Sequence, residues 1–353
     1  MSEGEALVER RGSAGCIVLN RPKALNALTL GMVRAISHAL DAWERDASVS
    51  RVVISGAGGR AFCAGGDIRQ LYEQRLAGDH AAQLTLWREE YQLNRRIRTY
   101  PKPYVALVDG LVMGGGVGVS LHGSHVVASE RYSFAMPEVG IGFFPDVGAA
   151  WRLARLPHHL GLYLALTGAR ADAGDALPLG LAQSFVAASD FPRLRSALEG
   201  DEPVADVIAR HAAPAPPSTL ADDAPLIAAC FASGDPEAIL AALTAEGSPT
   251  ALAIRAALLT KSPTSLAIAA RQIARCGSLS FDDALRLDFR IVSRLCRGQD
   301  FYEGVRALII DKDNRPRWRP PILAEVSAEA IDAYFAPLGA SELDFGDGAN
   351  ERS

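Results

Sequence analysis

The chain has 353 residues and a formal net charge of −5 at pH 7, and 49% of its residues are hydrophobic. This length allows a large buried core in one to three domains. The mildly acidic balance and the lack of any lysine- or arginine-rich run argue against a nucleic acid or an anionic membrane as a partner.

Residues 5–9 and 14–20 alternate and carry Val, Ile and Leu, which predicts a β-hairpin. Residues 28–46 show apolar side chains at helical spacing, with Thr29 as the expected N-cap. Residues 51–58 read as a short buried strand that ends in glycines.

A polar helix is expected at about 79–99, because the proline-rich segment 101–103 ends it. Strands follow at 104–110 and 125–130, and the glycines of 114–118 open a helix between them. Apolar strands that alternate with helices are typical of an α/β domain on a largely parallel sheet.

Beyond residue 147 the sequence predicts short helices and one strand, "QSFVA", up to residue 185. A helical stretch is expected at 280–296. We therefore expect four segments: a βαβ core at 1–210, a linker rich in Ala, Pro, Ser and Asp at 211–225, a helical region at 226–337 and a disordered tail at 338–353.

Features of secreted, membrane and metal-binding proteins are missing. The five cysteines are odd in number and scattered, which indicates a reducing compartment and argues against disulfides or a cysteine-based zinc site. The N-terminal segment 1–10 is acidic and unlike a targeting peptide, and the apolar run 104–121 holds Asp109 and five glycines. We expect a cytoplasmic protein without membrane association or metal.

Two glycine-rich stretches, 55–68 and 109–120, lie at strand ends. Each alone is more often a tight turn, but two from different strands can aim two backbone N–H groups at one carbonyl oxygen, as in an oxyanion hole. The spacing of a dinucleotide-binding fingerprint is missing.

Two acids, Glu138 and Asp146, stand in an apolar, glycine-rich stretch, each directly after a proline. They can form a catalytic pair. Asp146 can instead cap the following helix, and both roles can coexist because a position at a helix N-terminus would also lower its pKa. The alternative for Glu138 is a buried acid paired with an arginine such as Arg131 or Arg152. Cys63 lies near the same region, and packing is the favoured interpretation because no partner histidine is evident.

Four motifs carry a resemblance to a known family. They are "LNRPKALNALTLGM" (19–32), "GRAFCAGGDI" (59–68), "PKPYVALVDGLVMGGGVGVSLHG" (101–123) and "FAMPEVGIGFFPDVG" (134–148). In order and spacing, the sequence resembles the enoyl-CoA hydratase/isomerase (crotonase) superfamily. The segments "GGD", "FPDVG", "SPTSL" (262–266) and "CRGQDFYEGVRALIIDKDNRPRW" (296–318) are similar to its 3-hydroxyisobutyryl-CoA hydrolase branch.

The resemblance implies an α/β fold: a ClpP/crotonase-like spiral of βαβ units with a helical C-terminal region. It assigns the oxyanion donors to the backbone N–H groups of Gly66 and Gly115. It also places a set of candidate substrate contacts along the path of coenzyme A: Lys23, Ala24, Leu25, Ala27, Ala64, Asp67 and Ile68.

The catalytic glutamate of the family maps onto Glu138, and the second acid of the hydrolase branch maps onto Asp146. A further substrate-binding glutamate of that branch maps onto Glu90. The second glutamate of hydratases falls on Gly118, so the hydratase pair is incomplete.

The resemblance therefore implies a thioester hydrolase that acts on 3-hydroxyisobutyryl-CoA in valine catabolism. Glu138 would attack the thioester or activate water, while Asp146 would bind the substrate hydroxyl and move protons. No cofactor is expected, because coenzyme A is part of the substrate. An enoyl-CoA hydratase/isomerase and a non-catalytic acyl-CoA-binding protein are the alternatives, and assembly into homo-oligomers is possible.

Overall fold

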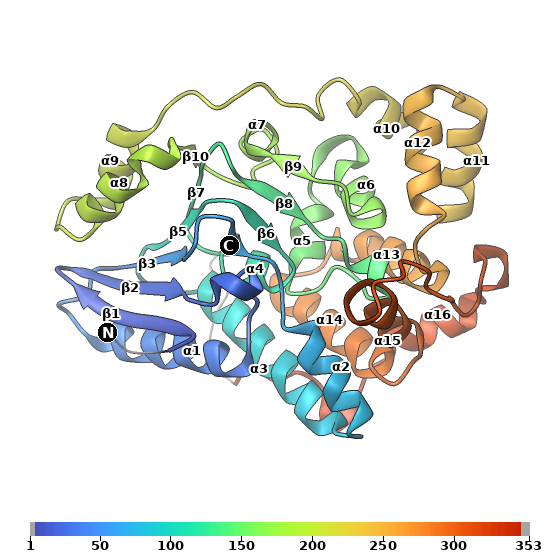
Figure 1. The fold of residues 1–353 in the computed structure, drawn as a ribbon, viewed down its shortest axis with the longest axis horizontal. Coiled ribbons are helices and arrows are strands. Elements are labelled where there is room, and N and C mark those ends of the chain that lie inside the picture. The colour runs from blue at the N-terminus through green and yellow to red at the C-terminus, as the bar shows by residue number, and fades with distance from the viewer. Residues whose placement is uncertain (1–3, 347–353) are drawn as a thin grey trace.

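Two sheets form the centre of the computed structural model, which describes residues 4–346 (Figure 1). In spatial order, the larger sheet consists of β1 (Ala6–Arg11), β2 (Ala14–Leu19), β3 (Arg51–Gly56), β5 (Tyr104–Val108), β7 (His125–Ala128) and β10 (Ser184–Phe185). The smaller sheet consists of β4 (Ala61–Cys63), β6 (Leu111–Met113), β8 (Ser133–Ala135) and β9 (Ala171–Asp172). The predicted hairpin is confirmed as the antiparallel pair β1–β2, and the larger sheet is otherwise parallel.

The chain alternates between the two sheets. Strands β3, β5 and β7 join the larger sheet, and each is followed at once by a strand of the smaller sheet, β4, β6 and β8. Because β4, β6 and β8 are mutually parallel, their carboxyl ends lie at one edge of the smaller sheet. The sequence did not predict these short strands, since three residues show no recognisable alternation.

Helices cover the sheets. The predicted helices at 28–46 and 79–99 are α1 (Leu30–Arg45) and α3 (His80–Arg98), and the Thr29 side chain accepts a hydrogen bond from the Met32 amide as expected of an N-cap. The remaining helices of the first two hundred residues are α2 (Ile68–Leu76), α4 (Gly115–Gly118), α5 (Ala149–Leu153), α6 (Leu160–Thr167), α7 (Ala173–Ala176) and α8 (Phe191–Leu198). Together with α9 (Val204–His211), α8 buries leucine and valine side chains against the larger sheet.

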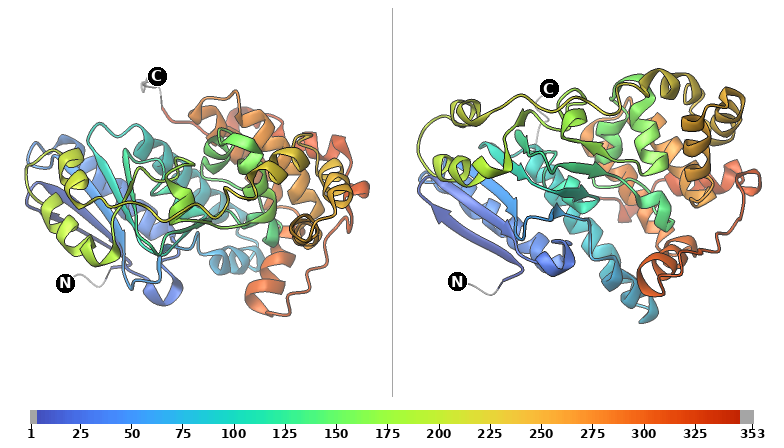
Figure 2. Two further views of the ribbon diagram at one scale, coloured as in Figure 1. Left: turned by 90° about the horizontal axis from the view of Figure 1, so that it is seen from above. Right: turned by 45° about the horizontal axis from the view of Figure 1, so that its top comes forward.

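The chain then runs through an extended stretch that passes over the sheets, within the predicted loop 211–225 (Figure 1). It leads to α10 (Ala224–Cys230), α11 (Pro236–Glu246), α12 (Pro249–Leu258), α13 (Pro263–Cys276), α14 (Phe281–Leu295), α15 (Asp300–Val305) and α16 (Ala328–Phe335). These helices form a block beside the sheets (Figure 2). Within residues 4–346, no helix is both long and apolar enough to span a membrane.

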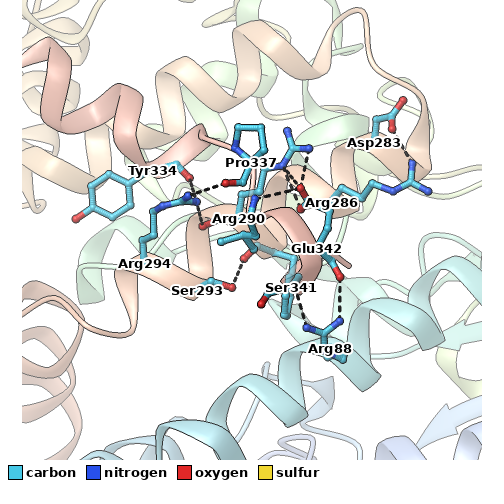
Figure 3. A network of polar contacts seen from close by, with 12 residues as sticks. Arg88, Asp283, Arg286, Arg290, Ser293, Arg294, Tyr334, Pro337, Ser341 and Glu342 are labelled. Atoms are coloured by element: carbon cyan, nitrogen blue, oxygen red, sulfur yellow. Dashed lines mark hydrogen bonds and ion pairs between the residues drawn. The ribbon is translucent and has the colours of Figure 1, made fainter. Parts of the chain in front are cut away.

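The C-terminal tail differs from the expectation of disorder as far as residue 346. Leu343 is buried, Arg290 forms an ion pair with Glu342, and Arg88 of α3 donates to the carbonyls of Ser341 and Glu342 (Figure 3). The low apolar content of this tail led to the prediction of disorder. The tail is ordered through one buried leucine and contacts of charged side chains, which the sequence does not show. The rest of the predicted tail, 347–353, lies outside the described residues.

Candidate active site

The backbone N–H groups of Gly66 and Gly115 lie close together at the shared edge of β4 and β6. A Cβ atom built on Gly115 would lie 3.5 Å from the Gly66 nitrogen. The neighbours of Gly66 pair with Leu28 through Gly65 O and the Asp67 amide, and in the described part of the chain the Gly66 N–H itself has no acceptor. Within residues 4–346, the Gly115 N–H also has no hydrogen-bond acceptor. Two such free donors side by side suit a developing oxyanion.

Glu138 faces these glycines from the short 3-10 helix Glu138–Ile141 that follows β8. Its Oε1 lies 3.0 Å from where a Cβ on Gly114 would stand, and its buried Oε2 has no hydrogen-bond partner in the described residues. Burial raises the pKa of Glu138 well above its ordinary value, and the nearby charge of Asp146 raises it further.

Among residues 4–346, no arginine forms an ion pair with Glu138, so the interpretation of Glu138 as a structural acid paired with an arginine is not supported. Arg131 forms its ion pair with Asp109. The guanidinium of Arg152 donates instead to the carbonyls of Gly180 and Leu121.

Asp146 is buried and receives a hydrogen bond from the Tyr91 hydroxyl at 2.7 Å. The helix-cap interpretation is wrong: Gly148 is the N-cap of α5, no side chain caps that helix, and only the backbone carbonyl of Asp146 accepts from the Ala149 amide. Burial raises the pKa of Asp146, although the Tyr91 bond acts in the opposite direction. The pKa of Asp146 is not lowered as expected, because desolvation of its carboxylate outweighs any stabilisation of the charge by the N-terminus of a five-residue helix.

Glu90 brings a third carboxyl group to the same place. It lies on the buried face of α3, and its Oε1 is 2.5 Å from the Cβ position of Gly115, without a hydrogen-bond partner in the described residues. Burial raises the pKa of Glu90 first, and the charge of Asp146 raises it second. Because three buried carboxyl groups cannot all ionise easily, the site retains at least one proton and can act as both acid and base.

Asn94, one helical turn beyond Glu90, is a residue that the sequence reasoning missed. It is fully buried, and neither amide atom of its side chain has a hydrogen-bond partner within residues 4–346. A Cβ on Gly118 would stand only 2.5 Å from Asn94 Nδ2 and 3.0 Å from Val147 Cβ. The space beside Gly118 is therefore already filled. The i, i+4 spacing of Glu90 and Asn94 was a signal in the sequence that could have identified Asn94 as a neighbour of the site.

The expected substrate contacts come from two segments that lie side by side. The Ala64 amide donates to the Leu25 carbonyl at 3.0 Å, and all seven side chains are partly or fully exposed. Asp67 also has structural roles: it accepts from the Gln70 amide at the start of α2 and pairs with Arg21 at 2.8 Å. The seven candidates are Lys23, Ala24, Leu25, Ala27, Ala64, Asp67 and Ile68.

Cys63 is fully buried, and burial raises the pKa of its thiol to about 12. A thiol in this state stays protonated at neutral pH and is a poor nucleophile. This agrees with the packing interpretation.

The sequence was then compared with known proteins. A family model described as enoyl-CoA hydratase/isomerase matches residues 14–335. The chain belongs to this family. The crotonase-like fold is confirmed by two solved structures: a carnitinyl-CoA dehydratase from Mycobacterium thermoresistibile (TM-score 0.93, 41% identity, 98% of this chain and 100% of that one) and an enoyl-CoA hydratase from Rhodobacter sphaeroides 2.4.1 (TM-score 0.92, 42% identity, 97% and 100%).

Curated relatives carry a more specific name. The 3-hydroxyisobutyryl-CoA hydrolase, mitochondrial, of Xenopus tropicalis is 48% identical over 97% of this chain and 91% of its own length. The protein of that name from Homo sapiens is 42% identical over the same shares. The expectation of a cytoplasmic protein is wrong on this finding, since these relatives are mitochondrial. Cysteine usage distinguishes oxidising from reducing compartments, not one reducing compartment from another.

Proposed function

We propose that this protein is a 3-hydroxyisobutyryl-CoA hydrolase, which converts 3-hydroxyisobutyryl-CoA and water to 3-hydroxyisobutyrate and coenzyme A. The observation that carries the proposal is the convergence of two free amides, Gly66 N–H and Gly115 N–H, with Glu90 and Glu138 beside them. A thioester hydrolase needs an oxyanion site and carboxyl groups that manage water and protons.

The relatives support the same reaction, because those at 42–48% identity over 97% of the chain are named for it. The sequence-based prediction of this hydrolase is thus confirmed at the level of the family branch. The second candidate is an enoyl-CoA hydratase, since two solved structures of similar fold carry hydratase or dehydratase names at 41–42% identity.

The surroundings of Gly118 favour the hydrolase. The resemblance implied a second glutamate at this position in hydratases, but this chain has glycine there. Asn94 and Val147 occupy the space that a side chain would need. A pair of glutamates on either side of an alkene therefore cannot form without displacing the buried side chains of Asn94 and Val147.

In the proposed reaction, the thioester oxygen accepts hydrogen bonds from Gly66 N–H and Gly115 N–H. Negative charge develops on this oxygen as the carbonyl carbon becomes tetrahedral, and each donor contributes about 3–4 kcal/mol to the stability of the transition state. The C–S bond then breaks, and the sulfur takes a proton from the carboxyl groups of the site. A thiol leaves readily because its pKa is near ~8.5.

Glu138 either removes a proton from the attacking water or attacks the carbonyl carbon itself. In the second case an anhydride forms between the acyl group and Glu138, and water then hydrolyses it to release 3-hydroxyisobutyrate and free Glu138. Asp146 accepts a hydrogen bond from the hydroxyl of the substrate and exchanges protons with Glu138. Burial raises the pKa of both Glu138 and Asp146, and the Tyr91 bond partly offsets this effect at Asp146. Activity should therefore rise with pH as these two carboxyl groups lose their protons.

We further propose that the enzyme works without a separate cofactor and serves valine breakdown. Coenzyme A enters as part of the substrate, and all groups named in the reaction belong to the chain. Assembly of copies of the chain stays a prediction.

A direct test compares two assays on one preparation: release of free thiol from 3-hydroxyisobutyryl-CoA, and hydration of crotonyl-CoA. Thiol release that is far faster than hydration supports the proposal, whereas fast hydration without free thiol would establish the hydratase instead. Rapid-quench trapping of an acyl-enzyme would assign direct attack by Glu138. Solvent oxygen found only in the product, without such an intermediate, would assign attack by water.

A further inference from the structure

The turn that carries Asp146 is held from outside by two buried side chains of the C-terminal helices. Gln272 on α13 donates from Nε2 to the Pro145 carbonyl at 2.8 Å. Asp288 on α14 accepts a hydrogen bond from the Gly148 amide at 2.9 Å. The same Nε2 of Gln272 also donates to Asp288 Oδ1 at 2.7 Å. The two side chains are therefore hydrogen-bonded to each other and to the two ends of the turn 145–148.

The middle of this turn is strained. Val147 has φ +53°, a left-handed conformation that β-branched residues rarely adopt, and Gly148 follows at φ +74°. Such a conformation persists only where the surroundings hold it. His122 supplies a third contact, because its Nε2 lies 2.7 Å from the Val147 carbonyl. Since a carbonyl only accepts, Nε2 carries the proton, and burial lowers the pKa of His122 to about 3 and keeps the ring neutral.

The polar composition of this cluster is unusual for a contact that only joins helices. Asp288 and Gln272 are both fully buried. A buried carboxyl group is costly compared with an apolar side chain of similar size, and burial raises the pKa of Asp288 well above its ordinary value. An apolar pair would pack α13 against α14 as well, but it would leave the Pro145 carbonyl and the Gly148 amide without partners.

We infer that Gln272 and Asp288 are positioning residues for the hydrolase: they hold Val147 in its strained conformation and thereby fix the backbone from which the Asp146 carboxyl reaches the acid cluster. Tyr91 then fixes the other end of that side chain. The inference rests on the proposed function, in which Asp146 binds the substrate hydroxyl. It gives the C-terminal helices a part in catalysis in addition to their packing.

The test measures thiol release by three variants. Gln272→Met removes both hydrogen bonds of Nε2 and keeps a similar side-chain volume. Asp288→Asn replaces the acceptor of the Gln272 Nε2 bond with an amide group. Val147→Gly removes the strain of the turn without changing a residue of α13 or α14. Asp283→Asn, on the exposed side of α14, is the matched control. We expect kcat to fall about 10- to 100-fold in each variant with KM within about threefold, because misplacement of a catalytic group affects the transition state most. The control should stay within about twofold of wild type.

Each kcat is expressed per folded molecule, determined from the circular dichroism of the same sample. If Gln272→Met and Asp288→Asn lower the melting temperature but leave kcat unchanged, the two residues are structural only and the inference is overturned. If a helix variant does not fold, Val147→Gly decides: unchanged kcat in that variant overturns the inference as well. Failure of the wild-type enzyme to release thiol would instead reject the proposed function.

Discussion

The Tyr91 hydroxyl donates a hydrogen bond of 2.7 Å to Asp146 Oδ2, and both side chains are buried. This bond joins α3, which also carries Glu90, to the turn between β8 and α5. Among residues 4–346, neither Glu90 nor Glu138 receives a hydrogen bond from another side chain. Asp146 is therefore the carboxyl group of the three whose ionised form a side-chain hydrogen bond stabilises, although burial still raises its pKa.

Tyr91→Phe should lower activity through this bond. Its loss raises the pKa of Asp146, since the hydrogen bond stabilises the ionised form. The acidic limb of the kcat profile should then move to higher pH, with kcat at pH 7 reduced by roughly 5- to 30-fold, equivalent to ~1–2 kcal/mol for the loss of one hydrogen bond. A kcat profile that coincides with that of the wild type would rule out this role.

Glu138→Gln should abolish most turnover without preventing binding. The amide cannot act as a base or a nucleophile, so kcat should fall about 10²- to 10⁴-fold while KM changes by less than about fivefold. Glu89→Gln is the matched control, because Glu89 is only partly buried and pairs with Arg34 away from the site. Wild-type turnover by the Glu138 variant would reject its proposed role.

Asp146→Asn should make the protein more stable at alkaline pH. The folded-state pKa of Asp146 is raised, so folded wild type holds a proton that the unfolded chain loses above about pH 4. Its contribution to stability is therefore present at low pH and is lost as pH rises through the folded pKa. Thermal unfolding at about pH 5 and pH 8 should show the variant gaining roughly 2 °C or more over wild type at the higher pH. An unchanged difference at the two pH values would contradict this account.

Gly115→Ala should remove the oxyanion site. The new Cβ would stand 2.5 Å from Glu90 Oε1 and 3.1 Å from Leu28 Cδ1, so either the Glu90 carboxyl group or the backbone of residue 115 must shift, and each shift disturbs the site. We expect kcat to fall about 10²- to 10³-fold, the effect of losing one oxyanion donor. Gly66→Ala is the comparison for folding, since a Cβ there meets no atom within 4 Å. Equal stability of the two variants would count against the crowding seen at Gly115.

Gly118→Ala should destabilise the fold through contact with Asn94. The Cβ would overlap Asn94 Nδ2 at 2.5 Å, which costs about 1–3 kcal/mol for an overpacked core. The loss should be smaller when Asn94→Ala is present, as a double-mutant cycle by urea unfolding would measure. Gly31→Ala on α1 is the control and should raise stability by roughly 0.5–1 kcal/mol. Additive effects of Gly118→Ala and Asn94→Ala would exclude the proposed competition for space.

The sequence by itself determined the local elements and the family. The hairpin, α1 with its Thr29 cap, and α3 follow from residue spacing that acts over a few neighbours, and these predictions are confirmed. The motifs around Gly66 and Glu138 led to the family that the comparisons establish. The strands β4, β6 and β8 escaped notice because three residues have no readable period.

Only the tertiary structure decided the roles of the polar side chains. Asp146 looked like a helix cap because sequence shows which residue precedes a helix, not where its carboxyl group points, and burial moved its pKa in the opposite direction. Glu90 and Asn94 come from α3, and Asp288 comes from α14, which lies almost two hundred positions further along the chain. Desolvation and charge repulsion depend on distances in space, so contacts between residues up to 140 positions apart determine the chemistry of this site.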